Sequence, residues 1–137
     1  MRKIIDEYFH LVILSILIIL IGYWYLSSLN SLKNISKRQK FTIAKAISDW
    51  HHKNTNGIGV DYEYFVSNRQ YSNTINMDLK KGQKYLLVFD SIKPENNVIL
   101  DIYPINNQSI APEKGWKLND VPISIDSTTI NDLILNN

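Results

Sequence analysis

An uncharged apolar segment near the N-terminus, Tyr8 to Leu29, constrains this chain most strongly. It contains no Asp, Glu, Lys or Arg, and its middle consists almost entirely of Leu, Ile and Val. A helix of this length is roughly 30 Å long, which matches the hydrocarbon core of a bilayer. Apolar side chains would cover every face of that helix, whereas a core helix of a small soluble domain keeps a polar stripe. The segment therefore predicts an uncleaved transmembrane helix.

A cleaved signal peptide is the main alternative for this segment. Signal peptides have a shorter apolar run and end at small residues. Here the run ends with Tyr23, Trp24 and Tyr25, which are typical of the aromatic belt at a membrane interface, and the chain has no Cys for lipoprotein processing. We expect residues 1–29 to form an N-terminal tail and transmembrane helix, with residues 8–29 in contact with the lipid of a bacterial inner (cytoplasmic) membrane.

The distribution of Lys and Arg predicts the orientation of the helix. Arg2 and Lys3 precede it, and five cations follow it: Lys33, Lys37, Arg38, Lys40 and Lys45. The more basic flank of a membrane helix usually stays on the cytoplasmic side. We therefore expect a single-pass protein with its C-terminal domain in the cytoplasm. The opposite orientation remains open, because a basic N-terminus before an apolar run also begins an anchor with a cytoplasmic N-terminus.

Composition limits what the rest of the chain does. The formal net charge is +2, but six of the 15 Lys and Arg and only two of the 13 Asp and Glu lie in residues 1–40. The remainder is slightly acidic, so we expect no nucleic-acid partner. We predict that residues 30–40 form a basic juxtamembrane linker, which either contacts anionic lipid head groups or is simply solvated.

Alternating apolar residues predict short strands from Phe41 onward. Five are expected, at residues 41–53, 59–66, 70–76, 84–90 and 98–103, with an Asn56-Gly57 hairpin turn after the first. Residues 84–90 are apolar enough to be buried on both faces. Strands this short, joined by tight turns, predict a mainly β fold. We expect residues 41–104 to form a small five-stranded SH3-like or OB-like barrel.

The C-terminal residues 105–137 predict an extension that packs back on the barrel. Pro112 and Pro122 prevent a long regular element, because proline lacks an amide donor and fixes φ. Trp116, like the isoleucines beyond it, is too apolar for a free tail. Residues 129–135 are expected to form either a short strand or one helical turn.

Six motifs follow one another in a recognisable order. They are TIAKAIS (42–48), GVDYEYFV (59–66), KKGQKYLLVFD (80–90), PENN (94–97), VILD (98–101) and IAPEKGW (110–116). Together with the N-terminal anchor, they resemble uncharacterised bacterial proteins that have one membrane helix and a small β domain. Gln83 stands where those proteins usually have an acid, and Ser67-Asn68-Arg69 replaces their usual Asn-Gly-Lys turn. The resemblance covers most of residues 41–116 and implies a fold, but no activity and no site residues.

Two sets of polar residues are candidates for a catalytic or metal site. His51 and His52 are possible zinc ligands, but neighbours on a strand point to opposite faces, and the sequence offers no Cys or acid pair to complete a site. Asp61 and Glu63 share a strand face, with Asp49 nearby in sequence. An acid–base pair needs one desolvated carboxylate, so a solvated face is the better interpretation.

Aromatic residues form the remaining candidate set: Tyr62, Tyr64, Phe65, Tyr71 and Tyr85. They are candidates for a nucleic-acid stacking platform or a groove for a proline-rich peptide, but few cations accompany them, so core and edge packing is expected. We therefore assign no catalytic, cofactor-binding or metal residue, and expect no cofactor and no enzymatic activity.

The sequence-based functional hypothesis is a membrane-anchored, non-enzymatic protein-interaction or accessory module of a bacterial envelope. It implies an unidentified protein partner. The alternatives are a small-ligand-binding or enzymatic β-barrel domain, or a membrane-anchored immunity protein.

Overall fold

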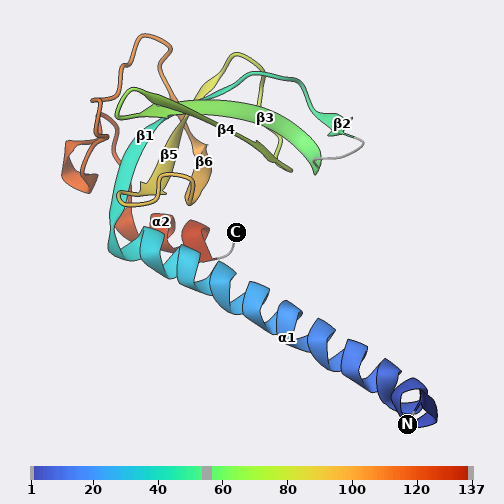
Figure 1. Cartoon of the computed structure of the whole chain (residues 1–137). Helices are drawn as coiled ribbons and strands as arrows, with labels where there is room; N and C mark the ends of the chain where they lie inside the picture. The colour runs from blue at the N-terminus through green and yellow to red at the C-terminus, as the bar shows by residue number, and fades with distance from the viewer. Residues whose placement is uncertain (1, 54–56, 136–137) are drawn as a thin grey trace.

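The longest element, helix α1, runs from Arg2 to Lys37 and extends away from the rest of the molecule (Figure 1). The structure is a computed structural model that describes residues 2–53 and 57–135. Within those residues α1 is the one helix long and apolar enough to cross a membrane, and its most apolar part is 0% buried. That part therefore has no place in the core of this chain, and its composition fits a membrane span or a signal sequence.

The predicted linker at residues 30–40 is wrong, because α1 continues through most of it. The helix ends at Lys37 and strand β1 begins at Gln39. Leu32 and Ile35 explain the continuation. They follow Leu29 at helical spacing, and Ile35 is only 1% exposed in the domain core. The last two turns of α1, residues 31–37, are thus a structural part of the folded domain, and the helix and the sheet are joined without a separate linker.

Six antiparallel strands form one sheet. They are β1 (Gln39–Ala46), β2 (His51–Lys53), β3 (Gly57–Val66), β4 (Arg69–Ile75), β5 (Lys84–Asp90) and β6 (Asn97–Ile105). The order is β2-β3-β1-β5-β6, with β4 also paired to β3. A helix followed by an antiparallel sheet confirms the coarse prediction.

The predicted single strand at residues 41–53 is divided into β1 and β2 by a bulge. Ala46 lies opposite Tyr62 and His51 opposite Gly59, so residues 47–50 include more chain than β3 can match. The Ser48 hydroxyl accepts a hydrogen bond from the Asp61 amide at 2.9 Å, in place of a ladder bond. No local sequence pattern signals that a side-chain hydroxyl replaces a ladder hydrogen bond here. This explains why the apolar alternation predicted a single strand. The expected Asn56 turn lies outside the described residues.

The sheet is open, so the expected SH3-like or OB-like barrel is not confirmed. No pairing joins β4 to β6 in the part of the chain that the structure describes. The sheet nevertheless curls strongly. The Tyr62 hydroxyl donates to Asn97 Oδ1 and the Tyr64 hydroxyl donates to the Pro94 carbonyl, both at 2.7 Å. These bonds cross from β3 to the start of β6, over β1 and β5.

Each face of the sheet has its own core. The alternation of β5 divides its residues between them: Tyr85, Leu87 and Phe89 pack on the inner face of the curl, and Leu86 and Val88 on the outer face. Burial of residues 84–90 on both faces is confirmed. The expected shared face of β3 is also confirmed, because its four members lie in the inner core: Val60, Tyr62, Tyr64 and Val66.

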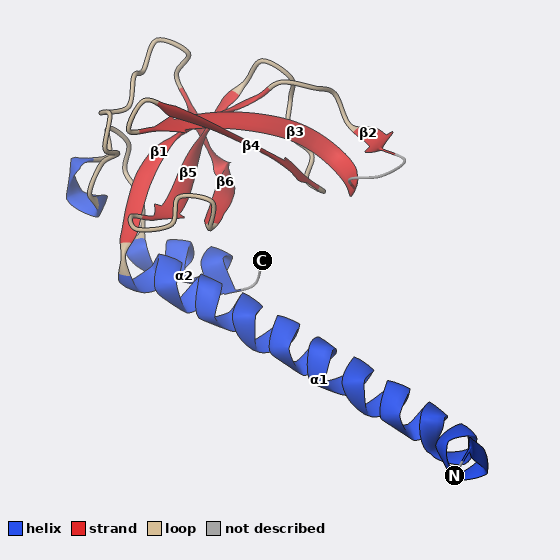
Figure 2. Cartoon of the chain, in the orientation of Figure 1, coloured by secondary structure: helices blue, strands red, loops and turns tan. Residues whose placement is uncertain are grey.

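Helices and the C-terminal residues cover the outer face. Helix α2 (Ser127–Leu135) packs beside the end of α1 (Figure 2) and buries Ile130 and Ile134 completely. Between β6 and α2 the chain forms one short 3₁₀ helix, η1 (Leu118–Asp120). This cover gives the apolar outer face of the sheet its own packing partner.

Candidate binding cleft between β1 and β3

The best-formed depression in the described part of the molecule is a cleft of about 420 Å³ on the outer face of the sheet. Strands β1, β3 and β5 form its floor, and the chain after β6 forms one wall. The lining residues are Thr42, Ile43, Lys45, Glu63, Phe65, Asn68, Lys84, Ser109, Ile110, Ala111, Pro112 and Glu113. The cleft therefore combines residues from both ends of the folded domain.

The cleft arises where β1 and β3 separate. Their ladder ends at the pair Ala44 and Tyr64. Beyond it, the buried Thr42 hydroxyl donates to the Phe65 carbonyl at 3.2 Å and bridges the widening gap. A side chain thus takes over from the backbone ladder at this point.

The C-terminal extension fills the far end of this gap. Phe41 and Trp116 exchange two backbone hydrogen bonds, at 3.0 and 2.8 Å, and the Ser67 amide donates to the Glu113 carbonyl at 2.7 Å. Gly115 permits the close approach, because its φ is 72° and a Cβ there would lie 2.7 Å from the Phe41 carbonyl oxygen. Residues 113–116 thus occupy the place beside β1 that β3 has left.

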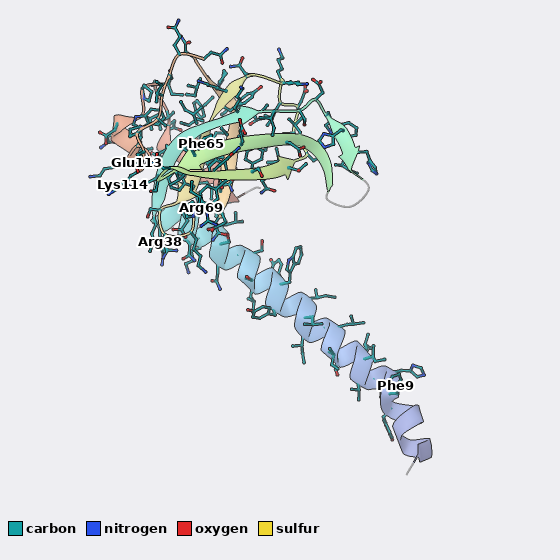
Figure 3. The ribbon with its side chains drawn as sticks, turned by 45° about the horizontal axis from the view of Figure 1, so that its top comes forward. Phe9, Arg38, Phe65, Arg69, Glu113 and Lys114 are labelled. Carbon is teal, nitrogen blue, oxygen red and sulfur yellow. The ribbon has the colours of Figure 1, made fainter. Side chains whose placement is uncertain are left out.

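The chemistry of the cleft is an apolar floor with charges of both signs at its rim. Phe65 on β3 is 54% exposed, and it lines the cleft together with Glu113 of the extension (Figure 3). The Glu113 carboxylate accepts a hydrogen bond from the Asn68 amide at 2.8 Å. Lys84 donates to the carbonyls of Asn107 and Ser109, which fixes the wall.

Lys45 is the cation of the cleft whose ammonium group is available to a ligand. It is exposed on β1, lines the cleft and forms no hydrogen bond or ion pair with any residue that the structure describes. Exposed aromatic side chains such as Phe65 provide most of the affinity at many protein-binding surfaces, and charges at the rim mainly set specificity.

His51 and His52 have different surroundings. His51 Nδ1 is within 3.0 Å of the Asp49 carbonyl and 3.2 Å of the Ser48 hydroxyl, and its Nε2 lies 3.5 Å from Asp61 Oδ2. His52 is exposed. No three His, Asp or Glu side chains gather as a metal-binding group within residues 2–53 and 57–135.

The carboxylates of Asp61 and Glu63 are engaged separately. Asp61 accepts from the Thr74 hydroxyl at 2.5 Å, and Glu63 accepts from the Gln70 amide at 2.7 Å. Both bonds tie β3 to β4. Glu63 nevertheless also lines the cleft, whereas Asp61 does not.

The aromatic set is divided between the two faces of the sheet. Tyr62, Tyr64 and Tyr85 are buried in the inner core, and Tyr71 packs against it. Tyr64 and Tyr71 stack with ring centroids 5.3 Å apart, and the Arg69 guanidinium lies 5.3 Å from the Tyr71 centroid. Only Phe65 points to the cleft, so these five residues do not form one platform.

Burial changes the acidity of two core tyrosines. It raises the pKa of Tyr62 to about 12 and raises the pKa of Tyr64 as well, with the neighbouring Tyr62 and Tyr71 adding to the effect at Tyr64. Both hydroxyls therefore remain neutral donors at ordinary pH, which suits their bonds to Asn97 and Pro94.

Comparison with protein-family models, with curated proteins and with solved structures gives no match. The resemblance to bacterial single-pass membrane proteins therefore stays a prediction from motifs. Sequence reasoning missed Lys45 and the 109–113 wall as parts of a site. The IAPEKGW motif held the only local signal, since its Gly115 permits the turn that brings the wall to β1.

Proposed function

We propose that this chain is a membrane-anchored, non-enzymatic interaction module whose β1–β3 cleft binds an extended segment of a protein partner. The exposed Phe65, which lies on the cleft floor with the unpaired Lys45 at the rim, is the observation that carries the proposal. The floor supplies apolar burial, and the rim supplies charges of both signs that set direction and specificity.

An extended segment suits this cleft because two diverging strands form its floor. Polypeptides often bind beside exposed strands, where backbone groups give affinity and pockets give side-chain specificity. The chain already uses this mode on itself, because residues 113–116 lie beside β1 in the same gap. An immunity protein, which neutralises a partner by binding it, would be one special case.

A small-ligand-binding or enzymatic role is the alternative, and the cleft volume favours it. A volume of about 420 Å³ lies in the range of small-molecule pockets, roughly 300–1,000 Å³. The charges of both signs at the rim and the strands that form the floor instead favour a protein segment. We therefore place binding of a protein segment first.

The proposed location is a bacterial inner membrane, with residues 8–29 spanning the bilayer and the sheet domain in the cytoplasm. The apolar, exposed surface of residues 8–29 and the basic residues after them support this arrangement. Carbonate extraction and protease treatment of spheroplasts test it. The chain should stay in the membrane pellet and become cleavable only after lysis.

Site-specific photocrosslinking tests the cleft. A photoreactive amino acid at Phe65 should capture one defined partner in the membrane fraction of the native host. The same substitution at Ile102 is the matched control, because that side chain is also 54% exposed but lies on β6, away from the cleft. The Phe65 adduct should disappear in Lys45→Glu.

Two outcomes would reject this proposal. Equal capture from Phe65 and Ile102 would show that the cleft has no special role. Saturable binding of a metabolite, lost in Phe65→Ala and accompanied by no protein adduct, would replace it with the small-ligand alternative.

A further inference from the structure

A second cleft lies between α1 and α2, and we propose that it binds an anionic phospholipid of the bilayer that holds α1. This inference rests on the proposed membrane anchoring. The cleft measures about 570 Å³. Its lining residues are Leu26, Leu29, Asn30, Leu32, Lys33, Ser36, Lys37 and Leu135.

The α1 side of this cleft is a single stripe whose character changes along the helix axis. Leu26, Leu29, Lys33 and Lys37 follow one another at spacings of three and four residues, so they share one face. The two leucines lie within the predicted membrane segment, and the two lysines lie beyond it. An anionic phospholipid has the same order, with acyl chains below and a charged head group above.

The positions of the two lysines along the helix axis agree with this arrangement. At about 1.5 Å per residue, Lys33 lies roughly 6 Å and Lys37 roughly 12 Å beyond Leu29 along the helix. The head-group layer on one side of a bilayer is roughly 5–8 Å thick. With Leu29 at the edge of the hydrocarbon, Lys33 therefore reaches the lipid phosphates and Lys37 lies just above them.

The opposite wall is α2, which is firmly held. Ile130 and Ile134 are completely buried, and the Ser36 hydroxyl lies 3.4 Å from Asn131 Oδ1 across the two helices. Leu135, at the end of α2, is 63% exposed and lines the cleft next to the leucines of α1. An exposed leucine in this place gains an apolar neighbour when a lipid chain fills the cleft.

The charges favour an anion over a neutral lipid. Lys33 and Lys37 form no hydrogen bond or ion pair with any described residue, and neither Asp132 of α2 nor Asp126, which precedes α2, is among the lining residues. Cations near an anionic membrane surface each add measurably to binding. A lipid with a net negative head group would therefore be retained in preference to a zwitterionic one.

The test uses the full chain in nanodiscs of phosphatidylcholine that contain a minor fraction of photoactivatable phosphatidylglycerol. Adducts should map to the facing residues of α1 and α2 around Leu29 and Leu135. Lys33→Gln with Lys37→Gln should lower this labelling on the order of tenfold. Lys80→Gln with Lys81→Gln is the matched control, because it removes the same charge from a turn that is not part of the cleft.

The other outcomes are equally decisive. Equal labelling in both double variants, or equal labelling by photoactivatable phosphatidylcholine, would show ordinary surrounding lipid and overturn the proposal. With a photoreactive amino acid placed at Leu29, chain-to-chain adducts would assign the cleft to a second copy and also overturn the proposal. A chain that fails to enter the nanodiscs would reject the anchoring itself, which separates that failure from failure of the lipid site alone.

Discussion

Arg38 and Asp90 form an ion pair that closes the junction between α1 and the sheet. Arg38 Nη2 lies 2.6 Å from Asp90 Oδ2, and the Asp90 side chain is 0% exposed. The second Asp90 oxygen accepts from the Ile92 amide, and the Arg38 carbonyl accepts from the Ser91 amide. The residue that follows α1 is therefore tied to the end of β5 through both its side chain and its backbone.

Removing the arginine should destabilise the domain clearly. Arg38→Ala leaves a carboxylate buried without its partner, so we expect the free energy of unfolding to fall by about 2–3 kcal/mol. Chemical denaturation of the full chain in detergent measures it. Arg69→Ala is the control, since this exposed guanidinium only lies over Tyr71 and should cost less than about 1 kcal/mol. Equal losses would contradict the assigned role of the pair.

Alkaline pH should destabilise the fold through Tyr62. In the unfolded chain a tyrosine loses its proton near its ordinary pKa of 10, but burial raises the pKa of Tyr62 to about 12. Between these values the unfolded state binds fewer protons, so stability present below pH 10 is lost as pH rises towards 12. The loss should reach about 2–3 kcal/mol for Tyr62.

Denaturation curves at pH 8, 10 and 11 check this dependence. Tyr62→Phe should make the dependence of stability on pH flatter above pH 10. An unaltered slope in Tyr62→Phe would mean that the hydroxyl is accessible to water.

Two glycines offer a matched test of the extension. Gly82 and Gly115 both have positive φ, 82° and 72°, but a Cβ at Gly82 meets nothing within 4 Å, whereas at Gly115 it meets Phe41 and Phe89. Gly82→Ala should cost about 1–2 kcal/mol from backbone strain alone. Gly115→Ala should cost about 1–3 kcal/mol more from the overlap. Thermal unfolding of the two variants side by side measures the difference. Equal shifts in the unfolding temperature would show that the extension moves to accommodate the added Cβ at no cost.

Acid should loosen α2 through its N-cap. Asp126 accepts from the amide and hydroxyl of Thr129, and these bonds, led by the hydroxyl, lower its pKa. The cap contributes stability above the ordinary carboxylate pKa and loses it as pH falls through the lowered value. Amide exchange across residues 128–134 should therefore accelerate in acid.

Substitution at the cap separates charge from hydrogen bonding. Asp126→Asn keeps an acceptor oxygen, so it should hold the helix at neutral pH but remove the acid dependence. Asp126→Ala should raise exchange at every pH. Identical behaviour of the two variants would argue against a capping role.

Local patterns predicted the strands, but not whether the sheet that they form is closed or open. Residues 85–89, between Lys84 and Asp90, are all apolar or aromatic, so burial of this strand on both faces followed from composition alone. The barrel is not confirmed, and the sequence did not show that the outer face has its own cover. That cover includes α2. Its capping signal at Asp126, with Ile130 and Ile134 one turn apart, was present, but residues 129–135 were expected to form either a short strand or one helical turn.

The cleft depends on contacts that no local pattern contains. Phe41 and Trp116 lie far apart in the chain, yet their backbones pair where β1 and β3 separate. Phe65 was singled out as one of five aromatic residues, but its position on the opposite face from the tyrosines follows from the alternation of β3. Lys45 was considered only as one of the cations that predict the orientation of the helix in the membrane.

The burial of Ile35 within the same helix that carries the exposed apolar residues 8–29 has a mechanical consequence for the proposed membrane arrangement. A hinge would let a tethered domain rotate freely above its anchor, whereas a continuous helix transmits every inclination to the sheet. With α1 in a bilayer as proposed, the bilayer thickness would set the tilt of the helix and so the orientation of the domain relative to the membrane.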